Sequence, residues 1–183
     1  MKILETPLKD AFLIEAEPFE DNRGLFARIF CKKELMNINN NKEIVQINQS
    51  ITKKKGSIRG MHYQISPFAE AKIVKCIKGR VYDVIIDLRK DSPTFLQHFP
   101  TELSKKNMKM IYVPEGFAHG FQTLEDNCEL IYFHTNYYSA EHEKRINCKD
   151  NILGIKWPIE ITDISEKDKK AETLEKNYEG IEL

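Results

Sequence analysis

Two runs rich in β-forming residues follow one another in the middle of the chain, AKIVKCI at residues 71–77 and RVYDVIIDL at residues 80–88. Gly79 separates the two runs, and a Ser-Pro pair at residues 92–93 follows the second. Short runs of Val, Ile and Tyr that are bounded by Gly or Pro are typical of β-strands. This stretch therefore predicts two β-strands.

The same pattern continues on both sides of these strands. MIYV at residues 110–113 and CELIYFH at residues 128–134 are further β-rich runs, and turn residues are frequent from about residue 44 to about residue 138. Many short strands of this kind indicate an all-β sandwich or barrel. Because side chains alternate between the two faces of a strand, Lys72 and Lys75 fall on opposite faces, and we expect one of these lysines to face inward.

Length and composition limit the possible functions. The 183 residues are enough for one ordinary domain, so we expect a single domain over residues 1–183. The 28 Lys and Arg residues balance the 28 Asp and Glu residues, so no overall charge favours binding to nucleic acid or to a membrane. Any contact with a phosphate group must then come from individual basic side chains at a binding site.

Cysteine spacing and hydropathy point to a cytoplasmic protein. The four Cys residues form no Cys-x-x-Cys pair, which disfavours a zinc knuckle and a disulfide framework, so we expect reduced thiols. The first residues, MKILET, lack the long apolar stretch that is typical of a signal peptide, and the sequence has no run of ~20 apolar residues. We therefore expect a soluble cytoplasmic protein.

The last part of the chain has a different composition. Ser165, followed three residues later by Asp168, resembles the start of a capped helix, and charged residues continue to about Lys176. We therefore expect a surface helix from Ser165 to about Lys176.

The segment PEGFAHGF at residues 114–121 resembles the second conserved motif of cupins, in which a Pro-x-Gly turn delivers a histidine into a small β-barrel. Gly56 and His62 match the spacing that opens the first cupin motif. Metal-binding cupins continue with His-x-His and a glutamate, whereas Tyr63-Gln64 follow here. The resemblance implies an all-β, cupin-like jelly-roll barrel or sandwich with a short C-terminal helical segment. We expect no metal and no other cofactor.

His62 and His119 need another role if the barrel holds no metal. Imidazole has an unperturbed pKa that suits proton transfer near neutral pH, so proton abstraction is one interpretation. The alternative is that both are structural, hydrogen-bonded histidines.

Several motifs together make the resemblance specific. They are FEDNRGLF (19–26), QINQS (46–50), GSIRGMHYQ (56–64), DLR (87–89), SPT (92–94), PEGFAHGF (114–121), Tyr132, YY (137–138), WP (157–158) and SEKD (165–168). Over nearly its whole length the chain resembles the dTDP-4-dehydrorhamnose 3,5-epimerase family.

The resemblance implies an acid–base mechanism next to a ketone. His62 matches the family's base, Lys72 the lysine near the 4-keto oxygen, and Tyr132 the acid that returns a proton on the opposite face. Asp168 matches the carboxylate that orients the catalytic imidazole. Its alternative role is in a helix capping box with Ser165.

The same resemblance implies substrate-binding residues. Arg23 and Arg59 match residues that grip the diphosphate, a task for which a planar guanidinium is suited. Tyr138 and Phe26 match aromatic residues that stack on the nucleobase. The alternatives are surface salt bridges for the two arginines and core packing for the aromatic residues.

Three further polar residues are candidates for the substrate site. Gln46 and Asn48 belong to the QINQS motif, and we assign both to substrate binding. His119 is either a substrate contact or a barrel-lining structural histidine. Asp83 either pairs with Lys72 from a neighbouring strand or is an ordinary polar residue that faces solvent.

Two positions depart from the family pattern. Arg28 stands where family members that use thymidine nucleotides usually carry a glutamate, and an arginine can only donate hydrogen bonds. We therefore also assign Arg28 to substrate binding, and it favours an acceptor-rich base such as guanine. Glu70 stands in place of a glutamine before Lys72, which predicts a remodelled substrate pocket.

These observations predict a metal-independent isomerase. Its expected reaction is inversion of carbon 3, carbon 5 or both in a nucleotide-diphosphate 4-keto-6-deoxy sugar of the dTDP-4-dehydro-6-deoxyglucose type, through an enolate, for surface polysaccharide synthesis. Alternatives are a GDP-4-keto-heptose epimerase of capsule synthesis, a cupin ketoisomerase and a non-catalytic sugar-nucleotide-binding module. The resemblance also implies a homodimer in which the amino-terminal strands, including Arg23, reach across to the neighbouring subunit.

Overall fold

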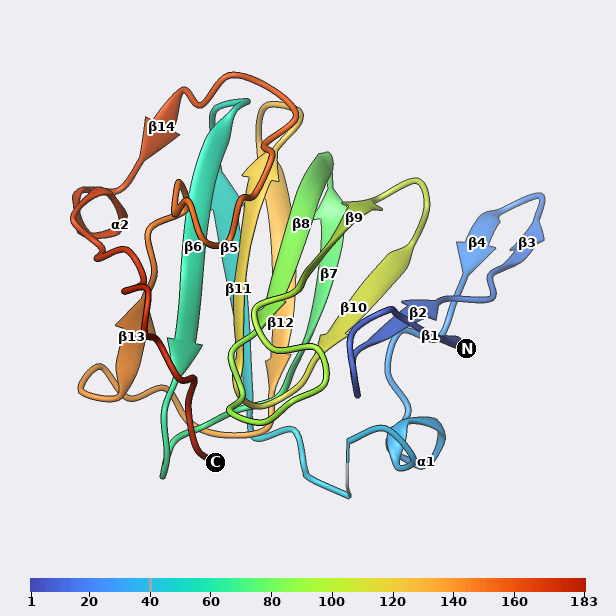
Figure 1. The fold of residues 1–183 in the computed structure, drawn as a ribbon. Coiled ribbons are helices and arrows are strands. Elements are labelled where there is room, and N and C mark those ends of the chain that lie inside the picture. The colour runs from blue at the N-terminus through green and yellow to red at the C-terminus, as the bar shows by residue number, and fades with distance from the viewer. Residues whose placement is uncertain (40) are drawn as a thin grey trace.

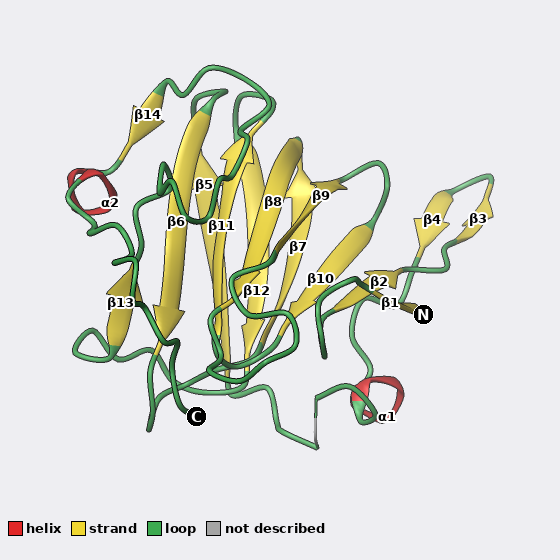
Figure 2. Ribbon diagram, viewed as in Figure 1, coloured by secondary structure: helices red, strands yellow, loops and turns green. Residues whose placement is uncertain are grey.

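The computed structural model describes residues 1–39 and 41–183, and β-strands dominate it (Figure 1, Figure 2). One sheet has six antiparallel strands in the order β1-β2-β10-β7-β12-β5. Their bounds are β1 (Lys2–Glu5), β2 (Phe12–Glu15), β10 (Lys109–Val113), β7 (Lys72–Lys78), β12 (Cys128–His134) and β5 (Gln46–Thr52).

The second sheet has the order β13-β6-β11-β8-β9, and β14 adds to it in parallel beside β6. Its strands are β13 (Glu143–Arg145), β6 (Ser57–Gln64), β11 (Phe117–Thr123), β8 (Arg80–Asp87), β9 (His98–Ser104) and β14 (Asp163–Ile164). The remaining elements are the hairpin of β3 (Phe19–Asp21) and β4 (Gly24–Phe26) and the helices α1 (Lys32–Leu35) and α2 (Glu166–Lys169).

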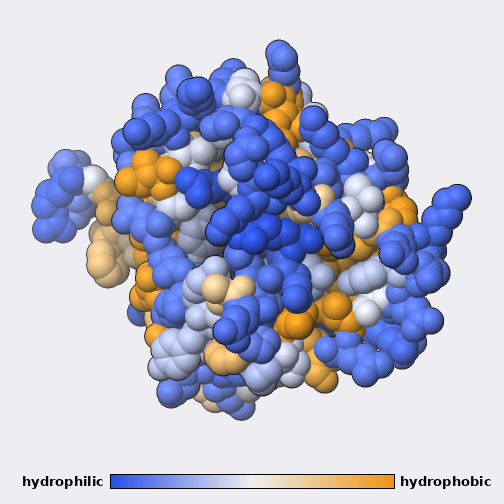
Figure 3. All heavy atoms as spheres, turned by 90° about the vertical axis from the view of Figure 1, so that its left-hand side faces the viewer, coloured by the Kyte–Doolittle hydropathy of each residue, from blue (hydrophilic) through white to orange (hydrophobic). Residues whose placement is uncertain are grey.

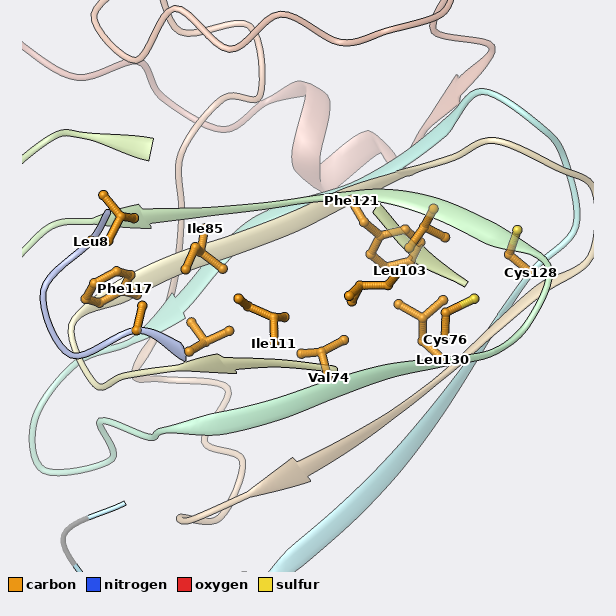
Figure 4. Packing of buried hydrophobic residues seen from close by; sticks show 13 residues of the cluster. Leu8, Val74, Cys76, Ile85, Leu103, Ile111, Phe117, Phe121, Cys128 and Leu130 are labelled. Carbon is orange, nitrogen blue, oxygen red and sulfur yellow. The ribbon is translucent and has the colours of Figure 1, made fainter. Parts of the chain in front are cut away.

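The main hydrophobic core lies between the two sheets (Figure 4). Val74 and Ile111 from the first sheet pack there with Ile85, Leu103 and Phe121 from the second. These side chains alternate with outward-facing ones along each strand, as two packed sheets require. The expected all-β jelly roll is therefore confirmed.

The outer faces of both sheets are also covered. Segments near the amino terminus, including Leu35 of α1, pack with Ile73 and Phe133 against the first sheet. Carboxy-terminal segments, including Leu153, pack with Val84 against the second. Because both faces of β7 are covered, Lys72 and Lys75 are both buried, although they lie on opposite faces of the strand.

Strand β7 shows which lysine faces inward. Val74 and Cys76 belong to the core between the sheets, and Lys72 shares their face by period-two alternation. Lys75 lies on the opposite face, where its ammonium donates to the carbonyl oxygen of Met108. Lys72 is thus the lysine that points between the sheets, as the pattern predicted for one of the two.

The expected helix from Ser165 to about Lys176 is wrong in length, because α2 ends at Lys169. Beyond the helix, the Asn147 side chain donates to the carbonyl oxygen of Ala171, and the Asp150 carboxylate accepts from the backbone N–H of Leu174. These two side chains take the backbone groups that a longer helix would have used.

The β3–β4 hairpin projects away from the two sheets (Figure 1). Phe19 and Phe26 on this hairpin are 69% and 77% exposed. None of the helices in the part of the chain that the structure describes combines the length and apolarity needed to cross a bilayer.

Candidate active site

A cavity of about 480 Å³ opens between the two sheets. Strands β5, β7 and β12 of the first sheet and β6, β11 and β13 of the second contribute lining residues, and β14 and α2 border it. In Figure 1 these bordering elements lie beside β6, and Figure 3 turns this side toward the viewer, where hydrophilic residues predominate. The lining of the cavity includes the buried polar side chains of Lys72, His119 and His134.

Two inward histidines lie next to each other on neighbouring strands of this cavity. His62 of β6 and His119 of β11 are direct register partners. Gly60 has φ +114°, and a Cβ atom there would lie 2.6 Å from Cα of Gly120. Glycine at this position therefore lets β6 and β11 approach closely beside the two histidines.

His62 is hydrogen-bonded to a carboxylate of α2. Its Nε2 atom lies 2.7 Å from Oδ1 of Asp168. Burial alone would raise the pKa of the Asp168 carboxyl, but the hydrogen bond and charge of His62 outweigh burial and hold the pKa below its usual value. An ionised carboxylate only accepts, so Nε2 carries the hydrogen and Nδ1 is the free basic atom of His62.

The two alternative roles of Asp168 use different atoms. Its backbone N–H donates to Oγ of Ser165 at 3.1 Å, which caps α2. Its carboxylate is turned to His62 instead of back to the cap. Asp168 therefore takes part in the cap through its backbone and orients the imidazole through its side chain.

Arg145 completes the surroundings of Asp168 and was not anticipated from the sequence. Its Nε atom lies 3.2 Å from Oδ1 of Asp168, and its guanidinium also pairs with Glu143. Arg145 lies on β13 and is the register partner of His62. A three-residue strand carries too little periodicity to predict this pairing.

Tyr132 lies on β12, in the sheet opposite His62, and lines the same cavity. Its phenol is within hydrogen-bond distance of Oγ of Ser50, at 3.0 Å. Burial raises the pKa of the Tyr132 phenol. The phenol therefore keeps its proton near neutral pH and is able to donate it.

Lys72 lies beside a carboxylate and a third histidine. Its Nζ atom is 3.4 Å from Oε1 of Glu70, whose Oε2 is 2.7 Å from Nδ1 of His134. Nε2 of His134 is 3.4 Å from Nδ2 of Asn48. Burial opposes ionisation of Glu70, but Lys72 and His134 together keep its pKa below the usual value. His134 was missed, although alternation along β12 puts it on the same face as Tyr132.

Asp83 does not have either of its predicted environments. It is fully buried, and its Oδ2 atom lies 2.8 Å from Nε2 of His119. The prediction that Asp83 pairs with Lys72 or faces solvent is therefore wrong, because the adjacent strand β11 brings His119 to it. His119 lines the cavity and also makes this buried contact.

Three other predicted binding residues lie at or near the cavity. Arg59 lines it and donates to Oγ1 of Thr52 at 2.9 Å. Tyr138 lines it as well, and its backbone N–H donates to Oε1 of Gln46 at 3.2 Å. Gln46 itself supports Tyr138 from β5.

Three predicted binding residues lie outside the cavity of this chain. Arg23 is 89% exposed on the projecting hairpin, where it pairs with Asp21. Phe26 is exposed on the same hairpin, and Arg28 donates to Glu34 at 2.5 Å. Within one chain, none of the three contributes to the site around His62.

A metal site requires several ligating side chains close together. Within residues 1–39 and 41–183, no three His, Cys, Asp or Glu side chains are grouped so as to hold a metal ion. The independence of the reaction from metal stays a prediction.

One cavity of this cupin-like barrel contains an imidazole held by a carboxylate, a buried phenol and an ammonium group. These are the groups with which an acid–base enzyme transfers protons. Comparison with known proteins identifies the family to which this enzyme belongs. The sequence model of the dTDP-4-dehydrorhamnose 3,5-epimerase family matches residues 5–176. The chain belongs to this family and is an epimerase.

Individual relatives agree with the family match. A dTDP-4-dehydrorhamnose 3,5-epimerase of Shigella flexneri is 40% identical over 169 residues, covering 92% of this chain and 93% of that protein. A crystal structure of the Bacillus anthracis enzyme with TDP and PPi bound has 41% identity and a TM-score of 0.91, and the match covers 94% of this chain and 99% of that one. The Legionella pneumophila enzyme in complex with dTDP-4-keto-L-rhamnose has 36% identity and a TM-score of 0.89, with 94% and 92% covered.

Proposed function

We propose that this protein inverts carbon 3, carbon 5 or both of a dTDP-linked 4-keto-6-deoxy sugar, of the dTDP-4-dehydro-6-deoxyglucose type. The arrangement of His62, Tyr132 and Lys72 around one cavity carries this proposal. The relative from Legionella pneumophila, which was solved with dTDP-4-keto-L-rhamnose, supports the choice of substrate. A cytoplasmic location and a role in surface polysaccharide synthesis, such as that of a capsule, form part of the same proposal.

His62 starts the reaction in this mechanism. Nδ1 of His62 removes the proton from the carbon next to the ketone, the C–H electron pair forms the enolate, and His62 becomes an imidazolium. Asp168 accepts from Nε2 at 2.7 Å, so it fixes the productive tautomer and stabilises the imidazolium.

Lys72 stabilises the intermediate. The enolate oxygen carries negative charge that the ketone oxygen lacks, so a fixed ammonium group lowers the energy of the enolate more than that of the substrate. Lys72 is buried on the inward face of β7, where water screens its charge little.

Tyr132 completes the inversion. Its O–H donates a proton to the enolate carbon from the face opposite His62, which forms the new C–H bond and leaves a phenolate. Two groups on two sheets are needed, because a single base would return the proton to the face that it left. Proton exchange with solvent then restores both His62 and Tyr132.

The nucleotide part of the substrate is proposed to lie between two subunits. Arg59 and Tyr138 line the cavity within one chain, while Arg23 and Phe26 lie on an exposed hairpin. In a homodimer, that hairpin from the partner subunit would supply the missing diphosphate and base contacts. Its two exposed phenylalanines support an interface role.

A GDP-linked heptose is the second candidate substrate, and Arg28 is the feature that favoured it. Arg28 donates to Glu34 on the surface, so its guanidinium already has a carboxylate partner within its own chain. The dTDP-linked hexose ranks first because two related structures were solved with TDP and with dTDP-4-keto-L-rhamnose. Competitive titration with dTDP and GDP decides between them, and tighter binding of GDP would reverse this order.

The test of the mechanism follows deuterium from solvent into the sugar. His62→Asn should abolish both exchange of the alpha proton and epimerisation, since no enolate forms. Tyr132→Phe should block or misdirect inversion while exchange by His62 continues. Each loss should be on the order of a hundredfold or more. A folded His62→Asn protein that exchanges the proton at the wild-type rate would exclude His62 as the base.

A further inference from the structure

Three side chains extend the site beyond Lys72 and take no part in the proton transfers of the proposed mechanism. Glu70 bridges Lys72 and His134, with 3.4 Å from its Oε1 to Nζ and 2.7 Å from its Oε2 to Nδ1. Asn48 follows, with Nδ2 at 3.4 Å from Nε2 of His134. All four residues line the cavity, so this polar chain is in place to act on the reaction.

Glu70 creates an electrostatic problem for the reaction. Its side chain is only 9% exposed, and it lies next to the single ammonium group that the mechanism requires. A carboxylate at this distance cancels much of the positive field of Lys72, and burial weakens the screening by water. The isolated pair of Lys72 and Glu70 would be nearly neutral and would stabilise an enolate poorly.

His134 is placed to correct this loss. An imidazolium on the other carboxylate oxygen balances Glu70, and the group of three then keeps one net positive charge. The Asn48 amide suits either form of the ring, because its nitrogen donates to neutral Nε2 and its oxygen accepts from protonated Nε2. Other titratable groups around His134 are Tyr132 on its own strand and, across the cavity, His62 and His119.

We infer that Glu70 and His134 form a charge-compensating pair, in which protonated His134 offsets the Glu70 carboxylate and preserves the positive field of Lys72 at the carbonyl oxygen of the substrate. Glu70 in turn holds the Lys72 ammonium and the His134 ring in place. Both are positioning residues for Lys72. This inference rests on the proposed function, since it needs an enolate to stabilise.

The test removes one charge, then the other. His134→Asn keeps an N–H donor near the position of Nδ1 but cannot carry a charge, so Glu70 is left uncompensated. Solvent deuterium exchange at the alpha carbon should slow about tenfold or more, with kcat affected more than KM. Adding Glu70→Gln removes the carboxylate charge without changing its shape. The double variant should therefore return to within about threefold of the wild-type exchange rate.

A purely structural role predicts the opposite, because two changes in one buried cluster would then damage the site more than one. The inference is overturned if the double variant exchanges the alpha proton as slowly as His134→Asn, or more slowly. It is also overturned if His134→Asn alone exchanges at the wild-type rate. Glu102→Gln on β9 is the matched control, since it makes the same chemical change outside the cavity, where Glu102 accepts from Arg80, and should leave the rate unchanged. Unchanged circular dichroism and melting temperature confirm folding.

His62→Asn is measured in parallel to separate the two proposals. Loss of exchange in His62→Asn, together with failure of the double variant to recover, rejects only the charge-compensating pair. Exchange at the wild-type rate in His62→Asn rejects the proposed mechanism itself.

Discussion

The Asp168 carboxylate lies 2.7 Å from Nε2 of His62, and this contact joins residues that are 106 positions apart in the sequence. The contact decides which ring nitrogen is basic. If it orients the catalytic imidazole, Asp168→Asn should lower kcat by about a hundredfold or more, since an amide can donate to Nε2 and favour the wrong tautomer. Steady-state kinetics with a 4-keto sugar nucleotide measures this loss.

Ser165→Ala is the control for the capping role of the same segment. It removes the hydroxyl that accepts from the Asp168 backbone, but it leaves the carboxylate. It should cost about 1 kcal/mol of stability in urea unfolding, with kcat nearly unchanged. Similar kcat losses in Ser165→Ala and Asp168→Asn would mean that Asp168 acts through the cap alone.

Two buried lysines on one strand offer a matched pair of variants. Lys72 faces the cavity, and Lys75 faces away from it toward the carbonyl oxygen of Met108. Lys72→Met should slow solvent deuterium exchange about a hundredfold, because the enolate loses its cation. Lys75→Met makes the same chemical change on the opposite face and should keep the wild-type exchange rate. Equal losses would show that Lys72 contributes only to folding.

The sequence predicted strands better than side-chain partners. Turn residues and alternation located the strands, and CELIYFH at residues 128–134 coincides with β12. The same alternation showed that one of Lys72 and Lys75 faces inward. Both properties are local, because they depend on a residue and its nearest neighbours along the chain.

Contacts between distant segments could not be predicted in this way. Asp83 pairs with His119 because β8 and β11 are neighbours, and α2 ends early because Asn147 and Asp150 hold the chain beyond it. Glu70 was noticed as a departure from the family pattern. Its partner His134 lies 64 positions away and needs the structure to be found.

Removal of metal ions tests the expected independence from metal. Residues 1–39 and 41–183 contain no group of three His, Cys, Asp or Glu side chains placed to hold a metal ion. We therefore expect kcat to be unchanged after dialysis against EDTA and unchanged again after addition of Mg²⁺, Mn²⁺ or Zn²⁺. Activity that is lost on chelation and restored by one of these ions would contradict the acid–base mechanism proposed for His62.

Stability at acidic pH should depend on Asp87. This buried carboxylate accepts hydrogen bonds from Arg89, from Ser92 at 2.5 Å and from Thr94 at 2.6 Å. Burial opposes ionisation, but these donors hold the pKa of Asp87 below its usual value. A lowered folded-state pKa adds stability above the unfolded value of about 3.9, and this stability is lost as the pH falls through the folded value.

The variant Asp87→Asn should therefore be less stable by about 3 kcal/mol at pH 7, since it leaves Arg89 without its buried partner. The difference from wild type should shrink as the pH falls below about 4, because Asp87 of the unfolded chain then binds a proton while the folded carboxylate still resists protonation. Urea unfolding at pH 7 and pH 3 measures both values. A difference that stays constant between these two pH values would contradict the assignment to the Asp87 charge.

The final prediction concerns the exposed hairpin and the proposed homodimer. Arg23 lies on this hairpin, away from the cavity of its own chain. If it binds the diphosphate in the partner's site, Arg23→Ala and His62→Asn chains should each be nearly inactive alone. A mixed dimer contains one site with intact His62 and intact Arg23. With random reassortment of subunits, the mixture should recover about a quarter of wild-type activity, because half of the dimers are mixed and each has one complete site. Sedimentation should show dimers for all three preparations. If Arg23 instead served its own chain, every site in the mixture would carry one defect, and mixing would restore no activity.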